Sequence, residues 1–273
     1  MSQLLKKPVK IALIQLASGS DKSQNLAHAR EKVLEAASAG AKIIVLPECF
    51  NSPYGTQYFP KYADTLLPSP PTSEQSPSFH ALSAMAAETK TYLVGGSIPE
   101  YSPTTKDHYN TSLTFSPSGE LEDYIQRIGG SFPGNHVTMI DLPEYGKIAV
   151  AICYDVRFPE LAMIAARKGC FALIYPGAFN TTTGPLHWRL QGQARAMDNQ
   201  IYVALCSPAR DETASYHAWG TVLVEAEEKE EIVYAELNGE KIEETRKGIP
   251  IQTQRRFDIY KDVSEDFKNG DEK

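Results

Sequence analysis

The chain has 273 residues, of which 42% are hydrophobic and 22% charged, the usual balance of a soluble globular protein. Lysine and arginine number 27 against 34 aspartates and glutamates, and the net charge of −7 argues against a nucleic-acid-binding surface. No apolar run is long enough to span a membrane, and the six histidines show no zinc-site spacing. We therefore expect no nucleic acid, membrane, metal or other cofactor to be bound.

Four cysteines are present without a CxxC pair or regular spacing: Cys49, Cys153, Cys170 and Cys206. In a chain of this size they indicate a reducing compartment rather than a disulfide framework. The segment Met1–Lys7 carries lysines but lacks the apolar core of a secretory signal. We expect a cytoplasmic protein, with the mitochondrion as the alternative.

Strands and helices alternate along the chain. The apolar run Val9–Leu16 predicts a buried strand, residues 23–39 carry apolar side chains at helical spacing up to Gly40, and Lys42–Leu46 predicts a second strand. Further helices are expected at about 79–90, 159–168, 186–199 and 240–247, and further strands at 92–95, 110–115, 171–175, 201–206 and 232–237. The alternation predicts a layered α/β fold, and no repeat or linker divides it, so we expect a single domain.

The segment around Cys153 carries the strongest indication of chemistry. An apolar run, Lys147–Ile152, leads into this cysteine, and Pro159 opens a predicted helix shortly after it. A thiol between a strand and a helix N-terminus lies near backbone N–H groups that favour a thiolate and an adjacent anion. This position suits a nucleophile, whereas a small buried cysteine at a strand end is the alternative.

A second candidate, Glu48, follows the predicted strand Lys42–Leu46. In open sheets, catalytic and binding residues lie at the carboxyl ends of the strands, so Glu48 and Cys153 are expected to lie close together there. A carboxylate beside a thiol can accept its proton and later return it to a leaving amine. The alternative for Glu48 is an ordinary solvated acid in a loop.

As wholes, these segments resemble the nitrilase superfamily of carbon–nitrogen hydrolases. Leu46–Tyr54 is similar to its glutamate segment and Ile152–Leu161 to its nucleophile segment. Four further segments resemble the omega-amidase branch in collinear order: Tyr175–Asn180, Thr183–Trp188, Arg195–Gln200 and Ser207–Arg210. The resemblance runs from about Val9 to Tyr260 and implies a four-layer α-β-β-α sandwich. It implies a carbon–nitrogen hydrolase domain over residues 9–260 and a polar tail over 261–273.

This resemblance implies an amidase acting on a small ω-amide of a dicarboxylic 2-oxo acid. Cys153 would attack the amide carbonyl, ammonia would leave, and water would hydrolyse the thioester, with Glu48 as general base and the Tyr154 N–H in the oxyanion hole. The implied substrate-binding residues are Tyr54, Tyr154, Arg157, Phe179, Asn180, Thr181 and Thr183, with Thr182 and Arg195 in the same neighbourhood. Relatives pair as homodimers through helices near the cysteine and a C-terminal segment, here Gln254–Asp258.

The sequence departs from the family where a catalytic lysine is expected. Arg127 stands at that position, and Gly129-Gly130 follows where the family continues with His-Leu-Phe-Asp. The planar guanidinium of arginine differs from an ammonium in reach and direction, so Arg127 is a doubtful oxyanion donor. A second stretch is short after Trp219-Gly220, where Thr221–Val224 runs directly into acidic residues.

The two short loops leave alternatives open. One is a catalytically impaired binding or scaffold protein that keeps the fold, and the other is that the sequence omits residues which the protein carries. An intact mass well above 30.2 kDa would indicate omitted residues. A redox-sensing thiol protein is a third class, for which Cys49 is the candidate resolving cysteine.

Overall fold

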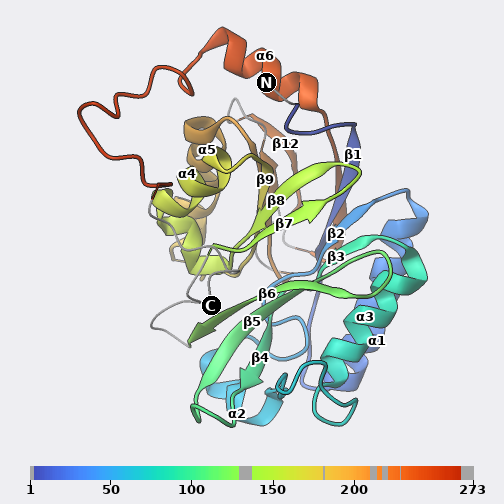
Figure 1. The fold of residues 1–273 in the computed structure, drawn as a ribbon. Helices are drawn as coiled ribbons and strands as arrows, with labels where there is room; N and C mark the ends of the chain where they lie inside the picture. The colour runs from blue at the N-terminus through green and yellow to red at the C-terminus, as the bar shows by residue number, and fades with distance from the viewer. Residues whose placement is uncertain are drawn as a thin grey trace.

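The computed structural model describes residues 3–128, 137–180, 182–209, 214–216, 221–227 and 229–265, with the backbone alone at 126–128 and 214–216 (Figure 1). Its helices are α1 (Lys22–Ser38), α2 (Phe59–Tyr62), α3 (Pro77–Thr89), α4 (Pro159–Arg167), α5 (Gly184–Asn199) and α6 (Gly239–Gly248), with 3-10 turns at Thr56–Tyr58 and Cys153–Arg157. Its strands are β1 (Val9–Gln15), β2 (Ile43–Val45), β3 (Tyr92–Val94), β4 (Ile98–Tyr101), β5 (His108–Phe115), β6 (Leu121–Ile128), β7 (Met139–Leu142), β8 (Gly146–Val150), β9 (Cys170–Pro176), β10 (Tyr202–Cys206), β11 (Ala214–Tyr216), β12 (Val222–Glu225) and β13 (Glu231–Leu237).

The strands form two sheets. The first has the order β13-β1-β2-β3-β5-β4, with β6 paired to β5, and the second has the order β12-β11-β10-β9-β8-β7. Strands β1, β2 and β3 are parallel, as are β8, β9 and β10. The carboxyl ends of β2 and β8 therefore lead into the two segments that carry Glu48 and Cys153.

The sheets pack face to face with helices on both outer faces. Apolar side chains of both sheets, such as Val45 and Ile174, form the central core. A second core packs the first sheet against α1 and α3, and a third packs the other sheet against α4 and α5. Figure 1 shows the two helix pairs on opposite sides of the sheets. The four-layer α-β-β-α sandwich expected from the sequence is confirmed.

Local chemistry sets the limits of the helices, and the end of α1 at Gly40 was predicted. The side chain of Asp21 caps α1 by accepting a hydrogen bond from the Gln24 N–H, and the chain leaves the helix at Gly40 with a φ of 89°. Helix α3 begins at Pro77 after Ser76, whose hydroxyl accepts the Phe79 N–H. These caps fix how the connections approach the sheets.

Strand β5 separates two environments. Leu113 and Phe115 pack into the core under α1 and α3. Because side chains alternate across a strand, Asn110 and Ser112 lie on the opposite face, toward the second sheet. Both are buried although they are polar. This alternation gives β5 an apolar face toward the helices and a polar face inside the sandwich.

Five strands were not expected from the sequence: β4, β6, β7, β11 and β12. Strand β6 matters most, since it carries the chain to Ile128 and pairs with β5. The backbone of Arg127 therefore lies on a regular strand. The run Leu121–Ile128 mixes charged with apolar residues, and its pairing with β5 supplies the order that its sequence pattern does not signal.

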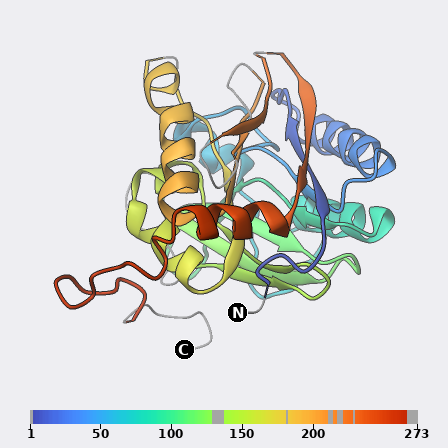
Figure 2. The same cartoon turned by 90° about the horizontal axis from the view of Figure 1, so that it is seen from above.

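After α6 the chain leaves the body as an extended arm, residues 249–265, and returns to α4 (Figure 2). The guanidinium of Arg167 on α4 donates from Nε to both oxygens of Asp262, at 2.7 and 2.8 Å, and to the hydroxyl of Ser264. The same guanidinium lies 4.3 Å from the ring centre of Phe257. Part of the segment expected to be a polar tail is thus bound to the domain.

Candidate active site

The turn that carries Glu48 is held by the segment after β3. The Pro47 carbonyl accepts the Ser97 N–H at 3.2 Å, and the Cys49 N–H donates to the Ser97 hydroxyl at 3.0 Å. At Gly96, φ is +62°, and a Cβ would lie 2.0 Å from the Pro47 oxygen, so only glycine fits there. The left-handed φ of 53° at Cys49 completes a tight turn that leaves Glu48 only 4% exposed.

A strand neighbour holds the carboxylate of Glu48. The Asn110 Nδ2 on β5 donates to the Glu48 Oε1 at 2.7 Å. Both side chains are buried. A hydrogen bond to a buried carboxylate fixes its orientation and stabilises its ionised form.

Cys153 lies on a second tight turn, two residues beyond the end of β8. Its φ of 43° is left-handed, and it begins the 3-10 turn Cys153–Arg157 that precedes α4. The Asp155 carboxylate accepts the Ile152 N–H at 2.8 Å, which closes the turn. Helix α4 begins at Pro159, where the sequence predicted it, and the 3-10 turn fills the interval between the cysteine and this helix.

The loop after β9 packs against the cysteine. A Cβ at Gly177 would lie 2.9 Å from the Cys153 Cα, so a side chain there would displace the turn. The Gly177 N–H donates to the carbonyl of Cys206, which ends β10. The thiol of Cys206 contacts the carbonyls of Ile14 at 3.4 Å and Val45 at 3.5 Å on the other sheet. The cysteine turn is thereby joined through β9 and β10 to the strand that precedes Glu48.

The glutamate segment and the cysteine turn meet at one carbonyl. The Cys153 Sγ lies 3.3 Å from the Ala178 oxygen, and the Tyr54 hydroxyl lies 3.3 Å from the same oxygen. Tyr54 belongs to the loop that follows Glu48, and its side chain is 53% exposed. The structure therefore brings the Leu46–Tyr54 and Ile152–Leu161 segments together at the mouth of the site.

A cation stands beside the cysteine turn. The guanidinium of Arg157 lies 5.0 Å from the ring centre of Tyr154 and 4.5 Å from that of Phe179. Its Nη1 is 3.2 Å from the Nδ1 of His187. Stacking between two rings orients the planar guanidinium, an arrangement suited to binding a carboxylate.

Other candidates serve the backbone. The Asn180 side-chain oxygen accepts the N–H groups of Thr182 and Thr183 and the Thr183 hydroxyl, at 2.8–3.0 Å, which shapes the turn before α5. Arg195 donates to the carbonyls of Val156 and Arg157, so it braces the cysteine turn and does not project toward a substrate. Thr181 lies outside the described residues.

Arg127 is placed only by its backbone. In the β5–β6 ladder it is paired with Asn110, the residue that holds Glu48. The short segment that follows, 129–136, lies outside the described residues, as do 217–220. The backbone of Arg127 therefore lies on β6, one strand beyond β5, whose Asn110 contacts Glu48.

Burial distinguishes two of the other thiols. Burial raises the pKa of Cys49 well above its usual value, and the neighbouring Glu48 adds to this effect. Burial likewise raises the pKa of Cys170 to about 12. Both thiols therefore stay protonated at neutral pH, when they are poor nucleophiles.

A family model described as carbon–nitrogen hydrolase matches residues 10–247. The chain belongs to the carbon–nitrogen hydrolase family. It is 52% identical to a hydrolase of Schizosaccharomyces pombe, over 93% of this chain and 84% of that protein. It is 47% identical to the omega-amidase Nit3 of Saccharomyces cerevisiae, over 96% and 98% of the two chains. The crystal structure of Nit3, a member of branch 10 of the nitrilase superfamily, matches with a TM-score of 0.87 and 46% identity over 94% and 99%. The chain is thus an enzyme of the nitrilase superfamily.

This carbon–nitrogen hydrolase lacks internal segments that these relatives contain. The alignments with the two yeast proteins extend over 281 and 291 positions, more than the 273 residues of the whole chain. Internal segments of the relatives therefore have no counterpart here. That finding agrees with the short stretches noted after Arg127 and Gly220.

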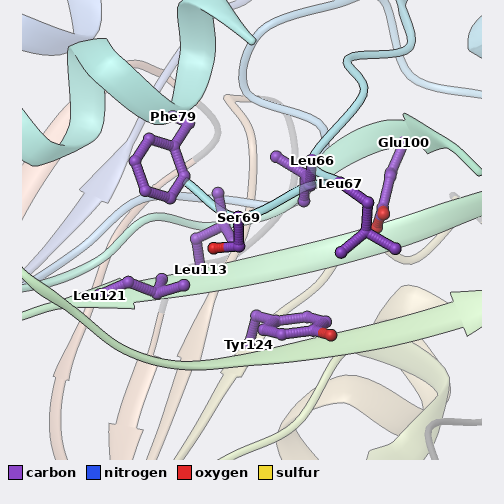
Figure 3. A pocket seen from close by; sticks show the side chains of 8 residues that line it. All are labelled: Leu66, Leu67, Ser69, Phe79, Glu100, Leu113, Leu121 and Tyr124. Atoms are coloured by element: carbon purple, nitrogen blue, oxygen red, sulfur yellow. The ribbon is translucent and has the colours of Figure 1, made fainter. Parts of the chain in front are cut away.

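A pocket elsewhere in this carbon–nitrogen hydrolase lies on the outer face of the first sheet, away from Glu48 (Figure 3). It is lined by Leu66, Leu67, Ser69, Phe79, Glu100, Leu113, Leu121 and Tyr124. Its volume of about 20 Å³ has room for a single water molecule. The buried Glu100 at its edge accepts the Thr111 hydroxyl at 2.5 Å. The pocket is too small for an amide substrate.

Among the described residues, no cluster of histidine, cysteine and acidic side chains would hold a metal ion. No helix in the described part of the chain is both long and apolar enough to cross a bilayer.

Sequence reasoning missed Asn110, Gly96 and Gly177. One signal for Asn110 was present, because asparagine is depleted in strands and this one lies inside a predicted strand. Gly95-Gly96 was interpreted only as permitting a close backbone approach, which the structure locates at Pro47. Nothing in the sequence alone connects Gly177 with Cys153.

Proposed function

We propose that the chain hydrolyses the ω-amide of a small dicarboxylic 2-oxo acid, releasing ammonia and the free acid. The observation that carries this proposal is the meeting of the Cys153 thiol and the Tyr54 hydroxyl at the Ala178 carbonyl. It joins the segment containing Glu48 to the segment containing the cysteine. Names of relatives support the substrate class, since the Nit3 protein of S. cerevisiae is an omega-amidase.

Glu48 and Cys153 divide the chemistry. Glu48 takes the thiol proton as the sulfur attacks the amide carbon, forming a C–S bond. The Tyr154 N–H stabilises the oxyanion of the tetrahedral intermediate. When the C–N bond breaks, Glu48 returns the proton to the nitrogen and ammonia leaves. A water molecule, deprotonated by Glu48, then attacks the thioester, and the thiol is the leaving group.

The opposite end of the substrate carries its own carboxylate. Arg157, stacked between Tyr154 and Phe179, supplies a charged, oriented donor pair for it. Tyr54 closes the same side, and Thr183 lies in the turn before α5. A charged anchor of this kind favours ω-amides of acids over neutral amides.

Ammonia release from ω-amides of 2-oxo acids related to glutamine and asparagine tests the proposal. Wild type and Cys170→Ala should release ammonia, whereas Cys153→Ala should not. Cys170 is the matched control because it is a buried cysteine at the start of β9, remote from the turn. No turnover by the full-length protein above the Cys153→Ala background would overturn the proposal.

A second function is favoured by Arg127 and the missing internal segments, namely an impaired enzyme that binds amides without turning them over. Loss of one oxyanion donor costs about a hundredfold in rate or more. Saturable binding of the ω-amide measured by calorimetry, without ammonia release, would support this alternative. Release of ammonia would exclude it.

We also propose a homodimer formed through the α5 face and the arm. Leu186, Leu190 and Met197 of α5 are 66%, 65% and 54% exposed, and Ile259 of the arm is 69% exposed. Large apolar side chains gathered on one face are typical of an interaction site.

Free cysteines at all four positions support a cytoplasmic location.

A further inference from the structure

We propose that Asn110 is a positioning residue for the reaction, holding one oxygen of Glu48 so that the other serves the thiol. The inference rests on the proposed function, and it names a residue to which neither the family resemblance nor the comparisons give a role. The contact joins residues 62 positions apart, at 2.7 Å, between side chains that are 4% and 9% exposed.

Chemistry fixes the direction of this contact. A carboxylate oxygen accepts, and the amide nitrogen of Asn110 donates, so the amide is oriented with Nδ2 toward Glu48. The Asn110 Oδ1 is buried and has no hydrogen-bond partner among the described residues. A buried asparagine that serves only packing would have partners for both its amide nitrogen and its amide oxygen. Here only the nitrogen has a partner among the described residues, and that partner is the Glu48 carboxylate.

Contacts from two directions hold Glu48. Gly96 and Ser97 clamp the turn from the side of β3, and Asn110 approaches from β5. The contacts of Gly96 and Ser97 fix the main chain next to Glu48, and the hydrogen bond from Asn110 fixes the orientation of its carboxylate. A general base requires both, because proton transfer depends on the alignment of donor and acceptor.

Several ionisable groups surround the carboxylate. Cys49 is next to it and stays protonated at neutral pH, and Cys153 comes from the facing sheet. Arg127 is paired with Asn110 on β6, although its side chain lies outside the described residues. The hydrogen bond from Asn110 orients the Glu48 carboxylate among these groups.

The test compares Asn110→Ala and Asn110→Asp with Ser112→Ala. Ser112 is the matched control because it lies two residues along β5 on the same face, is also buried, and its hydroxyl has no partner among the described residues. The first readout is the pH dependence of Cys153 alkylation by iodoacetamide, followed by mass spectrometry of the Cys153 peptide. It requires no amide turnover, so it separates failure of this inference from failure of the proposed function.

The acid limb of the alkylation profile should move to higher pH in Asn110→Ala, and further in Asn110→Asp. Two carboxylates at that distance would share a proton, which raises the pH at which a base becomes available. Ser112→Ala should match wild type. In ammonia release, kcat should fall by about tenfold to a hundredfold in Asn110→Ala while KM changes little, since a hydrogen bond to a charged group is lost from the base alone.

Identical alkylation profiles for wild type, Asn110→Ala and Asn110→Asp would overturn the proposal. An equal shift of the alkylation profile in Ser112→Ala would also overturn the proposal, because it would indicate that any substitution on this face of β5 disturbs the site. Thermal unfolding of each variant establishes that it is folded. If Asn110→Ala does not fold, Asn110→Asp alone decides, since it keeps the shape of the side chain and replaces the donor with an acceptor.

Discussion

Cys153 is the only half-buried thiol of the four, and its turn exposes it to polar surroundings. Cys49 and Cys170 are buried, and burial raises both their pKa values, that of Cys170 to about 12. Iodoacetamide at neutral pH should therefore alkylate Cys153 at least about tenfold faster than these two. Peptide mass spectrometry over time measures the rates. Comparable rates at the three cysteines would contradict the assignment of the nucleophile.

Substitution of Arg127 tests whether the absence of the family lysine limits activity. Arg127→Lys alone should change kcat/KM by less than about tenfold, because the family segment that follows the lysine is absent here, and stabilisation requires a donor already aimed at the oxyanion. Inserting a loop of the family's length with its lysine should raise kcat/KM by about a hundredfold. A large gain from the single substitution would show that β6 already delivers the side chain.

At the scale of elements, the turn after β2 depends on the turn after β3. Gly96→Ala places a Cβ 2.0 Å from the Pro47 oxygen at a φ of +62°. The free energy of unfolding should fall by about 2 kcal/mol or more. Activity should fall as well, since Glu48 moves with Pro47.

Gly19→Ala is the control for this substitution. Its Cβ would meet nothing closer than the Asn25 side chain at 3.9 Å, so stability should stay within about 0.5 kcal/mol of wild type. Urea denaturation measures both variants. Equal effects of the two substitutions would refute the clamp at Gly96.

Asp262 is the acid that pairs the arm with Arg167 of α4. Burial alone would raise the pKa of Asp262, but the Ser264 N–H and the Arg167 guanidinium hold it below the usual 3.8. The attachment is therefore complete above about pH 4 and is lost only as the pH falls through the lowered value. Asp262→Asn should release the arm at pH 7, seen as faster proteolysis after Arg255 and Arg256. Unchanged cleavage would show that Phe257 and its neighbours hold the arm without the ion pair.

Prediction from the sequence succeeded where the signal was local. The apolar runs of β1, β2 and β9, and the glycine that ends α1, Gly40, each carry their signal within a few residues. Asn110 could not be assigned to Glu48, because their contact spans 62 residues and depends on which strands become neighbours. Strand β6 was missed for the same reason, since its order comes from pairing with β5. Sheet neighbours are set by tertiary packing, and a single sequence carries little information on them.

At the scale of the whole molecule, light scattering should give the mass of a dimer. Leu190→Asp on α5 should yield a monomer, because a charge at the centre of an apolar interface is costly to bury. Leu67→Asp is the matched control, a 40% exposed leucine on the opposite side of the sandwich, and should remain a dimer. A dimer in both variants would place the interface elsewhere.

The alternation of β5 restricts how this enzyme can change in length during evolution. Because side chains alternate along β5, Asn110 lies on the inner face and contacts Glu48. The next residue, Thr111, lies on the outer face and contacts Glu100. One inserted or deleted residue between His108 and Asn110 would exchange these faces and remove the amide from the acid. Lineages of this fold should therefore tolerate insertions after β6 and between β10 and β12, but should keep the length of the β4–β5 hairpin.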